Sequence, residues 1–131
     1  MKFSNRITPK YPLSCLCIII IWILCFCTPP HTPLDNVALA DKWTHIIMYG
    51  GTCSIILLEY TKCHNDIKLG HIIWVWLIPV AMGGLIEILQ AHCTNGRRSG
   101  DWIDFIANII GATIAFFIGL LIIRVRKNTK K

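Results

Sequence analysis

Polar groups that can do chemistry, namely carboxylate, ammonium, amide, imidazole and hydroxyl groups, gather in three separate stretches of this sequence. They are Asp41, Lys42, His45 and Tyr49 in the first stretch, Glu87 and Gln90 in the second, and Asp101, Asp104 and Asn108 in the third. Asp41, His45 and Tyr49 recur every four residues, Glu87 and Gln90 are three apart, and Asp104 and Asn108 follow Asp101 by three and seven. Each of these sets therefore lies on one face of a helix. Carboxylates and imidazoles serve in proton transfer, and ammonium and guanidinium groups hold anions.

Glu87, Asp104 and His45 are the candidate catalytic residues, because each could donate or accept a proton. Lys42 and Arg98 are the candidates for binding an anion. The remaining polar residues are predicted to form a supporting network, which comprises Asp41, Tyr49, Gln90, Asp101 and Asn108. Helix capping is an open alternative for the aspartates at positions 41, 101 and 104, and a buried ion pair that only locks the helices together is one for Glu87.

The composition predicts which elements must position these residues. The chain has 131 residues, of which 54% are hydrophobic and 15% are charged, and its mean hydropathy is +0.57. A typical soluble domain has about 25% charged residues, and a disordered chain has few apolar ones. We therefore expect an all-α protein, a single domain over residues 1–131 that crosses the membrane four times, with helices at about 12–28, 44–60, 71–91 and 102–123. The first run is short, so a cleaved signal peptide is the alternative to a retained helix there.

The basic residues predict the orientation. An even number of spans puts both termini on one side, and with that side in the cytoplasm all but Lys42, Arg97 and Arg98 of the 13 Lys and Arg residues are cytoplasmic. This bias follows the positive-inside rule for short loops and indicates a multi-pass protein of the bacterial cytoplasmic membrane. Since topology accounts for the net charge of +6, no nucleic-acid partner is predicted.

The same topology brings the three polar stretches together. The second span begins outside, the third ends outside and the fourth begins outside. At about 1.5 Å per residue, His45, Glu87, Asp104 and Asn108 all lie within roughly 10 Å of the outer interface. Charged groups that face lipid are costly, so we expect these side chains to face one another in one polar pocket.

No cofactor or metal is predicted from spacing. The seven cysteines fall mostly inside apolar runs, in pairs such as Cys15 with Cys17 that point to nearly opposite sides of a helix. The Asp, Glu, His and Asn side chains are of types that hold a divalent cation, but no known ligand spacing joins them.

Two blocks of this sequence resemble the VanZ-like family of small bacterial membrane proteins. The first block is Asp41-Lys42-Trp43-Thr44-His45 with Tyr49, and the second runs from Glu87 through Gln90 to Arg98-Ser99-Gly100-Asp101-Trp102-Ile103-Asp104 and on to Asn108 and Gly111. The resemblance is strongest over residues 41–119. It implies a four-helix membrane protein and, for the founding member, an association with low-level resistance to the glycopeptide teicoplanin. It implies no particular reaction.

The leading functional hypothesis is a pocket at the outer face that binds or modifies an anionic cell-envelope precursor or lipid head group. The alternative is a non-enzymatic membrane module whose ionic network is structural and which binds a partner protein or a lipid. Whether the chain is an enzyme stays open. The expected partners are the lipid bilayer, a lipid-linked cell-wall precursor and, through the small residues Gly111, Ala115 and Gly119, a second copy of the chain.

Overall fold

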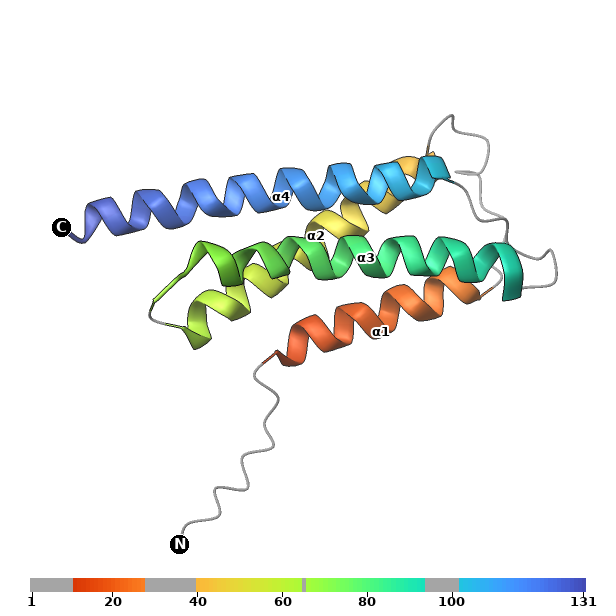
Figure 1. Ribbon diagram of the computed structural model, residues 1–131, viewed down its shortest axis with the longest axis horizontal. Helices are drawn as coiled ribbons and strands as arrows, with labels where there is room; N and C mark the ends of the chain where they lie inside the picture. The colour runs from red at the N-terminus through yellow and green to blue at the C-terminus, as the bar shows by residue number, and fades with distance from the viewer. Residues whose placement is uncertain (1–10, 28–39, 65, 94–101) are drawn as a thin grey trace, which may run out of the picture.

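The computed structural model describes residues 11–27, 40–64, 66–93 and 102–131, and its secondary structure there is entirely helical. The elements are α1 (Pro12–Phe26), α2 (Ala40–Cys63), α3 (Leu69–Cys93) and α4 (Trp102–Thr129) (Figure 1). The prediction of an all-α fold is therefore confirmed for the residues described.

The helices differ from the predicted spans mainly at their ends. Helix α2 begins four residues before the expected Thr44, and α4 continues six residues beyond the expected Ile123. Hydropathy marks only the apolar part of a helix, whereas backbone hydrogen bonding continues into polar flanks. Those flanks suit the helix dipole, because Asp41 lies in the first turn of α2, and Arg126 and Lys127 lie in the last turn of α4.

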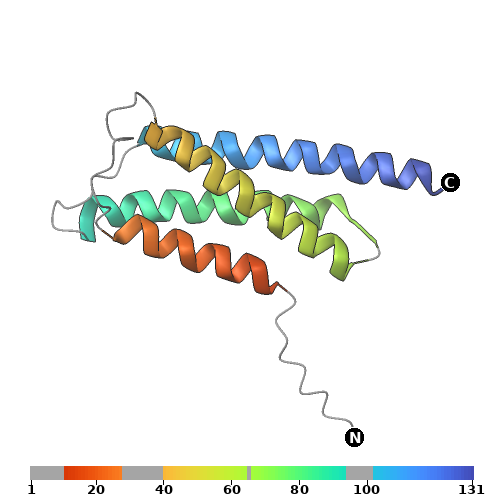
Figure 2. The ribbon, with the colours of Figure 1, turned by 180° about the vertical axis from the view of Figure 1, so that it is seen from behind.

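The four helices form a bundle in which α3 and α4 lie side by side and α2 crosses behind them in Figure 1. Helix α1 packs on α2 and α3, and α2 packs most extensively on α4. Helices α2 and α4 begin, and α1 and α3 end, at the same end of the bundle (Figures 1 and 2). We call this the polar end. Because α2 and α4 both begin at the polar end, they run parallel.

Glycines set the close contact between these parallel helices. A Cβ atom on Gly50 of α2 would lie 3.1 Å from the carbonyl oxygen of Gly111, and one on Gly111 would overlap the carbonyl oxygen of Ile46. A Cβ on Gly119 would overlap the side chain of Leu57. Two of the three small residues considered for pairing with a second copy, Gly111 and Gly119, thus pack on α2 of the same chain.

Two apolar clusters hold the bundle together. Residues of α2, α3 and α4 form the larger one, which contains Cys53, Leu57, Tyr60, Ile72, Val75, Val80, Ala112 and Phe116. The smaller one joins α1 to α2 and α3 through Ile21, Cys25, Tyr49 and Ile86. An indole–hydroxyl hydrogen bond of 2.9 Å, from Trp76 to Thr113, adds a polar link between α3 and α4.

Side chains of neighbouring helices cap both ends of α1. The buried carboxylate of Glu59 on α2 accepts hydrogen bonds from the backbone N–H groups of Leu13 (2.9 Å) and Ser14 (3.0 Å) and from the Ser14 hydroxyl (2.5 Å). At the other end, the Gln90 amide on α3 donates to the carbonyl of Cys25 (2.7 Å). The terminal N–H and C=O groups of a helix have no partners within the helix, so these contacts anchor α1.

Helices α3 and α4 are each long and apolar enough to cross a membrane, whereas α1 is a shorter apolar helix. Of the apolar 18-residue segment by which α4 qualifies as a membrane span, only 28% is buried in the bundle. Large apolar side chains such as Trp74, Leu85, Phe117 and Leu121 are exposed along α3 and α4. The apolar surface of these two helices therefore faces outward instead of forming an enclosed core.

A candidate functional site at the polar end of the bundle

An ion pair joins the first turns of α2 and α4. The ammonium of Lys42 contacts Oδ1 of Asp104, and it lies 3.6 Å from Oδ2 of Asp41. The side chain of Lys42 is 21% exposed and that of Asp104 is 11% exposed, whereas the side chain of Asp41 is 67% exposed. One cation is thus shared by two carboxylates at the edge of the bundle.

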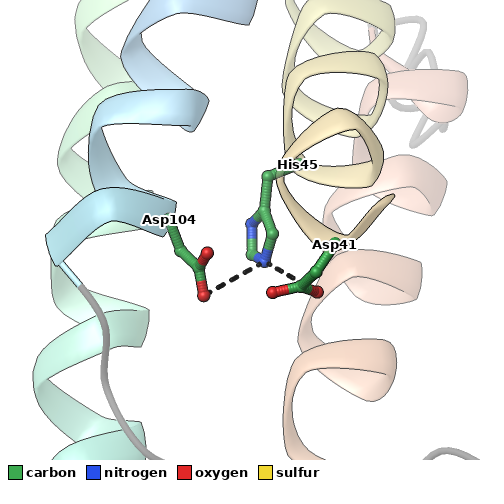
Figure 3. A group of neighbouring side chains, drawn as sticks. All are labelled: Asp41, His45 and Asp104. Carbon is green, nitrogen blue, oxygen red and sulfur yellow. Dashed lines mark ion pairs between the residues drawn. The ribbon is translucent and has the colours of Figure 1, made fainter. Parts of the chain in front are cut away.

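The imidazole of His45 lies directly behind this ion pair and is buried. Its Nδ1 lies 2.9 Å from Oδ1 of Asn108, and because an amide oxygen only accepts, Nδ1 is the donor. Its Nε2 points at both carboxylates, 3.9 Å from Oδ1 of Asp41 and 3.7 Å from Oδ2 of Asp104 (Figure 3). Each carboxylate thus directs one oxygen toward Lys42 and the other toward His45.

The parallel packing of α2 and α4 explains this arrangement. Lys42 pairs with Asp104, 62 residues later in the sequence, and His45 pairs with Asn108, 63 residues later. Residues one turn apart on α2 therefore meet residues one turn apart on α4. The contact between Gly50 and Gly111, one to two turns further in, brings the two backbones close enough for these short side chains to meet.

A second layer lies deeper in the bundle. Tyr49, one turn after His45, is fully buried, and Cys25 of α1 and the buried Glu87 of α3 lie near it. A Cβ on Gly83 of α3 would lie 3.1 Å from the Tyr49 ring and 2.9 Å from Nδ2 of Asn108, so this glycine lets α3 approach. Among the residues described, the Tyr49 hydroxyl and Asn108 Nδ2 form no hydrogen bond.

The structure thus brings together five of the polar residues singled out from the sequence, which are Asp41, Lys42, His45, Asp104 and Asn108. Tyr49 and the buried Glu87 lie in the second layer. Gln90 contacts α1 through the carbonyl of Cys25. Arg98 and Asp101 lie outside the described residues. Glu59 was not singled out, and its only signal in the sequence is an acid near the end of an apolar run.

The charges at this end restrict what it can bind. Asp41, Asp104 and Glu87 are acidic, and Lys42 is already shared by two of them. A buried imidazole between two carboxylates can hold a proton or complete a cation site. An anionic ligand at these residues needs positive charge in addition to that of Lys42.

No protein-family model, curated protein or solved structure matches this chain. The family and the function must therefore be inferred from the residues of the chain and from their geometry.

Proposed function

We propose that this chain is a VanZ-like integral membrane protein of the bacterial cytoplasmic membrane, with four membrane helices and both termini in the cytoplasm. The length and apolarity of α3 and α4, and the exposure of their apolar side chains, support this proposal. The basic residues support the orientation, since Arg124, Arg126 and Lys127 lie at the end of α4 opposite the polar end. The polar end then faces outward.

The function we propose is binding of the anionic head group of a cell-envelope precursor at this polar end. The observation that carries it is the network of the half-buried Lys42 with the buried His45, Asp104 and Asn108. This network lies at one end of helices whose apolar side chains are exposed. Charged groups at this depth are costly and are kept in membrane proteins mainly for binding or transport. Lys42 and Arg98 would contact phosphate oxygens, and Glu87, Asp104 and His45 would manage protons or a cation.

The ion pair between Lys42 and Asp104 also favours a second candidate function. It links α2 to α4, so the network could serve only to hold the helices in register. The chain would then be a non-enzymatic module that binds a partner protein or a lipid through other surfaces.

A Glu87→Gln substitution separates the two functions, because it removes a charge while keeping the size of a buried side chain. In a strain that lacks the protein, we expect the pool of lipid-linked cell-wall intermediates to change. Wild-type protein should restore that pool and Glu87→Gln should not, although both accumulate equally in membranes. Asp66→Asn, an exposed acid at the opposite end, is the matched control and should restore the pool.

An unchanged pool in every strain would contradict the precursor hypothesis. Loss of Glu87→Gln protein from the membrane together with loss of function would favour the structural module. The same strains test the association implied by the VanZ resemblance, which predicts greater teicoplanin sensitivity in the strain that lacks the protein.

A further inference from the structure

We propose that Asp41, His45 and Asp104 bind a divalent transition-metal cation. One ligand atom from each residue can be chosen so that all three lie within 4.8 Å of one another (Figure 3). An imidazole nitrogen and two carboxylate oxygens are suitable ligands for Mn²⁺ or Zn²⁺. The proposed binding of the cation does not depend on the proposed head-group function.

The separations between these atoms fit a shared cation better than direct hydrogen bonds. His45 Nε2 is 3.7 Å from Asp104 Oδ2 and 3.9 Å from Asp41 Oδ1. N–H···O hydrogen bonds are about 2.7–3.2 Å long. Two ligands that are each about 2.1 Å from a tetrahedral metal lie ~3.4 Å apart. Small side-chain rotations would therefore bring these three atoms to coordinating distance.

The surroundings of the buried His45 ring are a second observation, and its tautomer is inferred from them. Because Nδ1 donates to the amide oxygen of the buried Asn108, the neutral imidazole has its lone pair on Nε2. Within the described parts of the chain, this nitrogen forms no hydrogen bond, yet the side chain is only 6% exposed. Metal-ligating histidines commonly donate their other N–H to a carbonyl or carboxylate, as His45 does here.

Lys42 takes the carboxylate oxygens that face away from this nitrogen. It contacts Oδ1 of Asp104 and lies 3.6 Å from Oδ2 of Asp41, which leaves Asp104 Oδ2 and Asp41 Oδ1 for a metal. The ammonium also repels a second cation, so moderate affinity is expected.

Three protein ligands leave coordination positions open, and the exposed side chain of Asp41 marks the side from which another ligand can enter. We infer that the cation bridges these residues to a phosphate group, and this role rests on the proposed function. It would explain how this end of the bundle, whose described residues include more carboxylates than cations, accepts an anion.

The test is a titration of the purified full-length chain in detergent with Mn²⁺, followed by electron paramagnetic resonance. Mn²⁺ is the probe because it prefers oxygen and nitrogen ligands, so the exposed Cys15, Cys27, Cys63 and Cys93 should not compete. We expect one saturable site per chain. Asp41→Asn should weaken it at least ~10-fold without disturbing packing, because its side chain is 67% exposed. Asp66→Asn should bind like the wild type.

His45→Asn is the second ligand variant. Its fold is checked by thiol labelling: Cys53 is buried in the wild type, and it should stay unreactive in the variant. Absence of saturable binding to the wild type would overturn the proposed site, as would equal binding by the wild type, Asp41→Asn and His45→Asn. The assay contains no head group, so it can fail or succeed independently of the proposed function. Precursor binding that persists in excess EDTA would overturn the bridging role.

Discussion

Replacing Gly111 by alanine is expected to lower the free energy of unfolding by about 2–3 kcal/mol, the cost of overpacking a tight contact. The added Cβ would overlap the carbonyl oxygen of Ile46 and lie 2.9 Å from its carbonyl carbon and Cα atom. These are backbone atoms of a helix and cannot move aside as a side chain can. Helices α2 and α4 would have to separate, which would also pull His45 away from Asn108.

Gly51→Ala is the matched control on the same helix pair. A Cβ at Gly51 has no atom within 4 Å. Alanine is favoured over glycine inside a helix by about 0.5–1 kcal/mol, so this variant should be slightly more stable than the wild type. Thermal or SDS-induced unfolding of the purified proteins measures both. Equal stability of Gly111→Ala and Gly51→Ala would contradict the close backbone contact between α2 and α4 at Gly111.

Replacing Glu59 by alanine is expected to release α1 from the bundle, because the helix would lose three hydrogen bonds to a charged group. The carboxylate accepts bonds from the backbone of Leu13 and Ser14 and from the Ser14 hydroxyl. Tyr11, which precedes the helix, provides no side-chain cap. Without Glu59, the first N–H groups of α1 would lose their side-chain acceptor.

Thiol labelling distinguishes local release of α1 from global unfolding. Cys25 on α1 is 2% exposed and Cys53 on α2 is 0% exposed, so neither should react in the wild type. In backgrounds that keep one of these two cysteines, Glu59→Ala should make Cys25 reactive and leave Cys53 protected. Asp66→Ala, at an exposed acid, should change neither rate. Protection of Cys25 in Glu59→Ala equal to that in the wild type would contradict the anchoring role.

Hydropathy and spacing predicted the four helices well, but they predicted the residues at which the helices begin and end less well. The all-α class and the positions of the four helices follow from apolar runs, because a helix that buries or exposes apolar side chains needs a continuous stretch of them. Polar turns such as those containing Asp41 and Arg126 extend the helices beyond the apolar runs. Four membrane crossings, the orientation and the VanZ-like assignment stay predictions.

The candidate site was predictable residue by residue but not as a set of contacts. Intervals of four identified the helix faces that carry His45 and Asn108, since local geometry alone determines which residues share a face. The sequence did not predict the proposed metal site, because Asp104 is on a different helix from Asp41 and His45, and no linear spacing joins them. For the same reason nothing in the sequence revealed that Glu59 caps α1.

The sequence by itself determined which segments are helical and which faces carry polar groups, because both depend on residues within a few turns of one another. Only the tertiary structure decided that α2 and α4 pack in parallel through Gly50 and Gly111. That contact places the Nε2 atom of His45 between two carboxylates from different helices. Such pairings depend on how closely two backbones can approach, which is a property of the packed helices and not of either stretch alone.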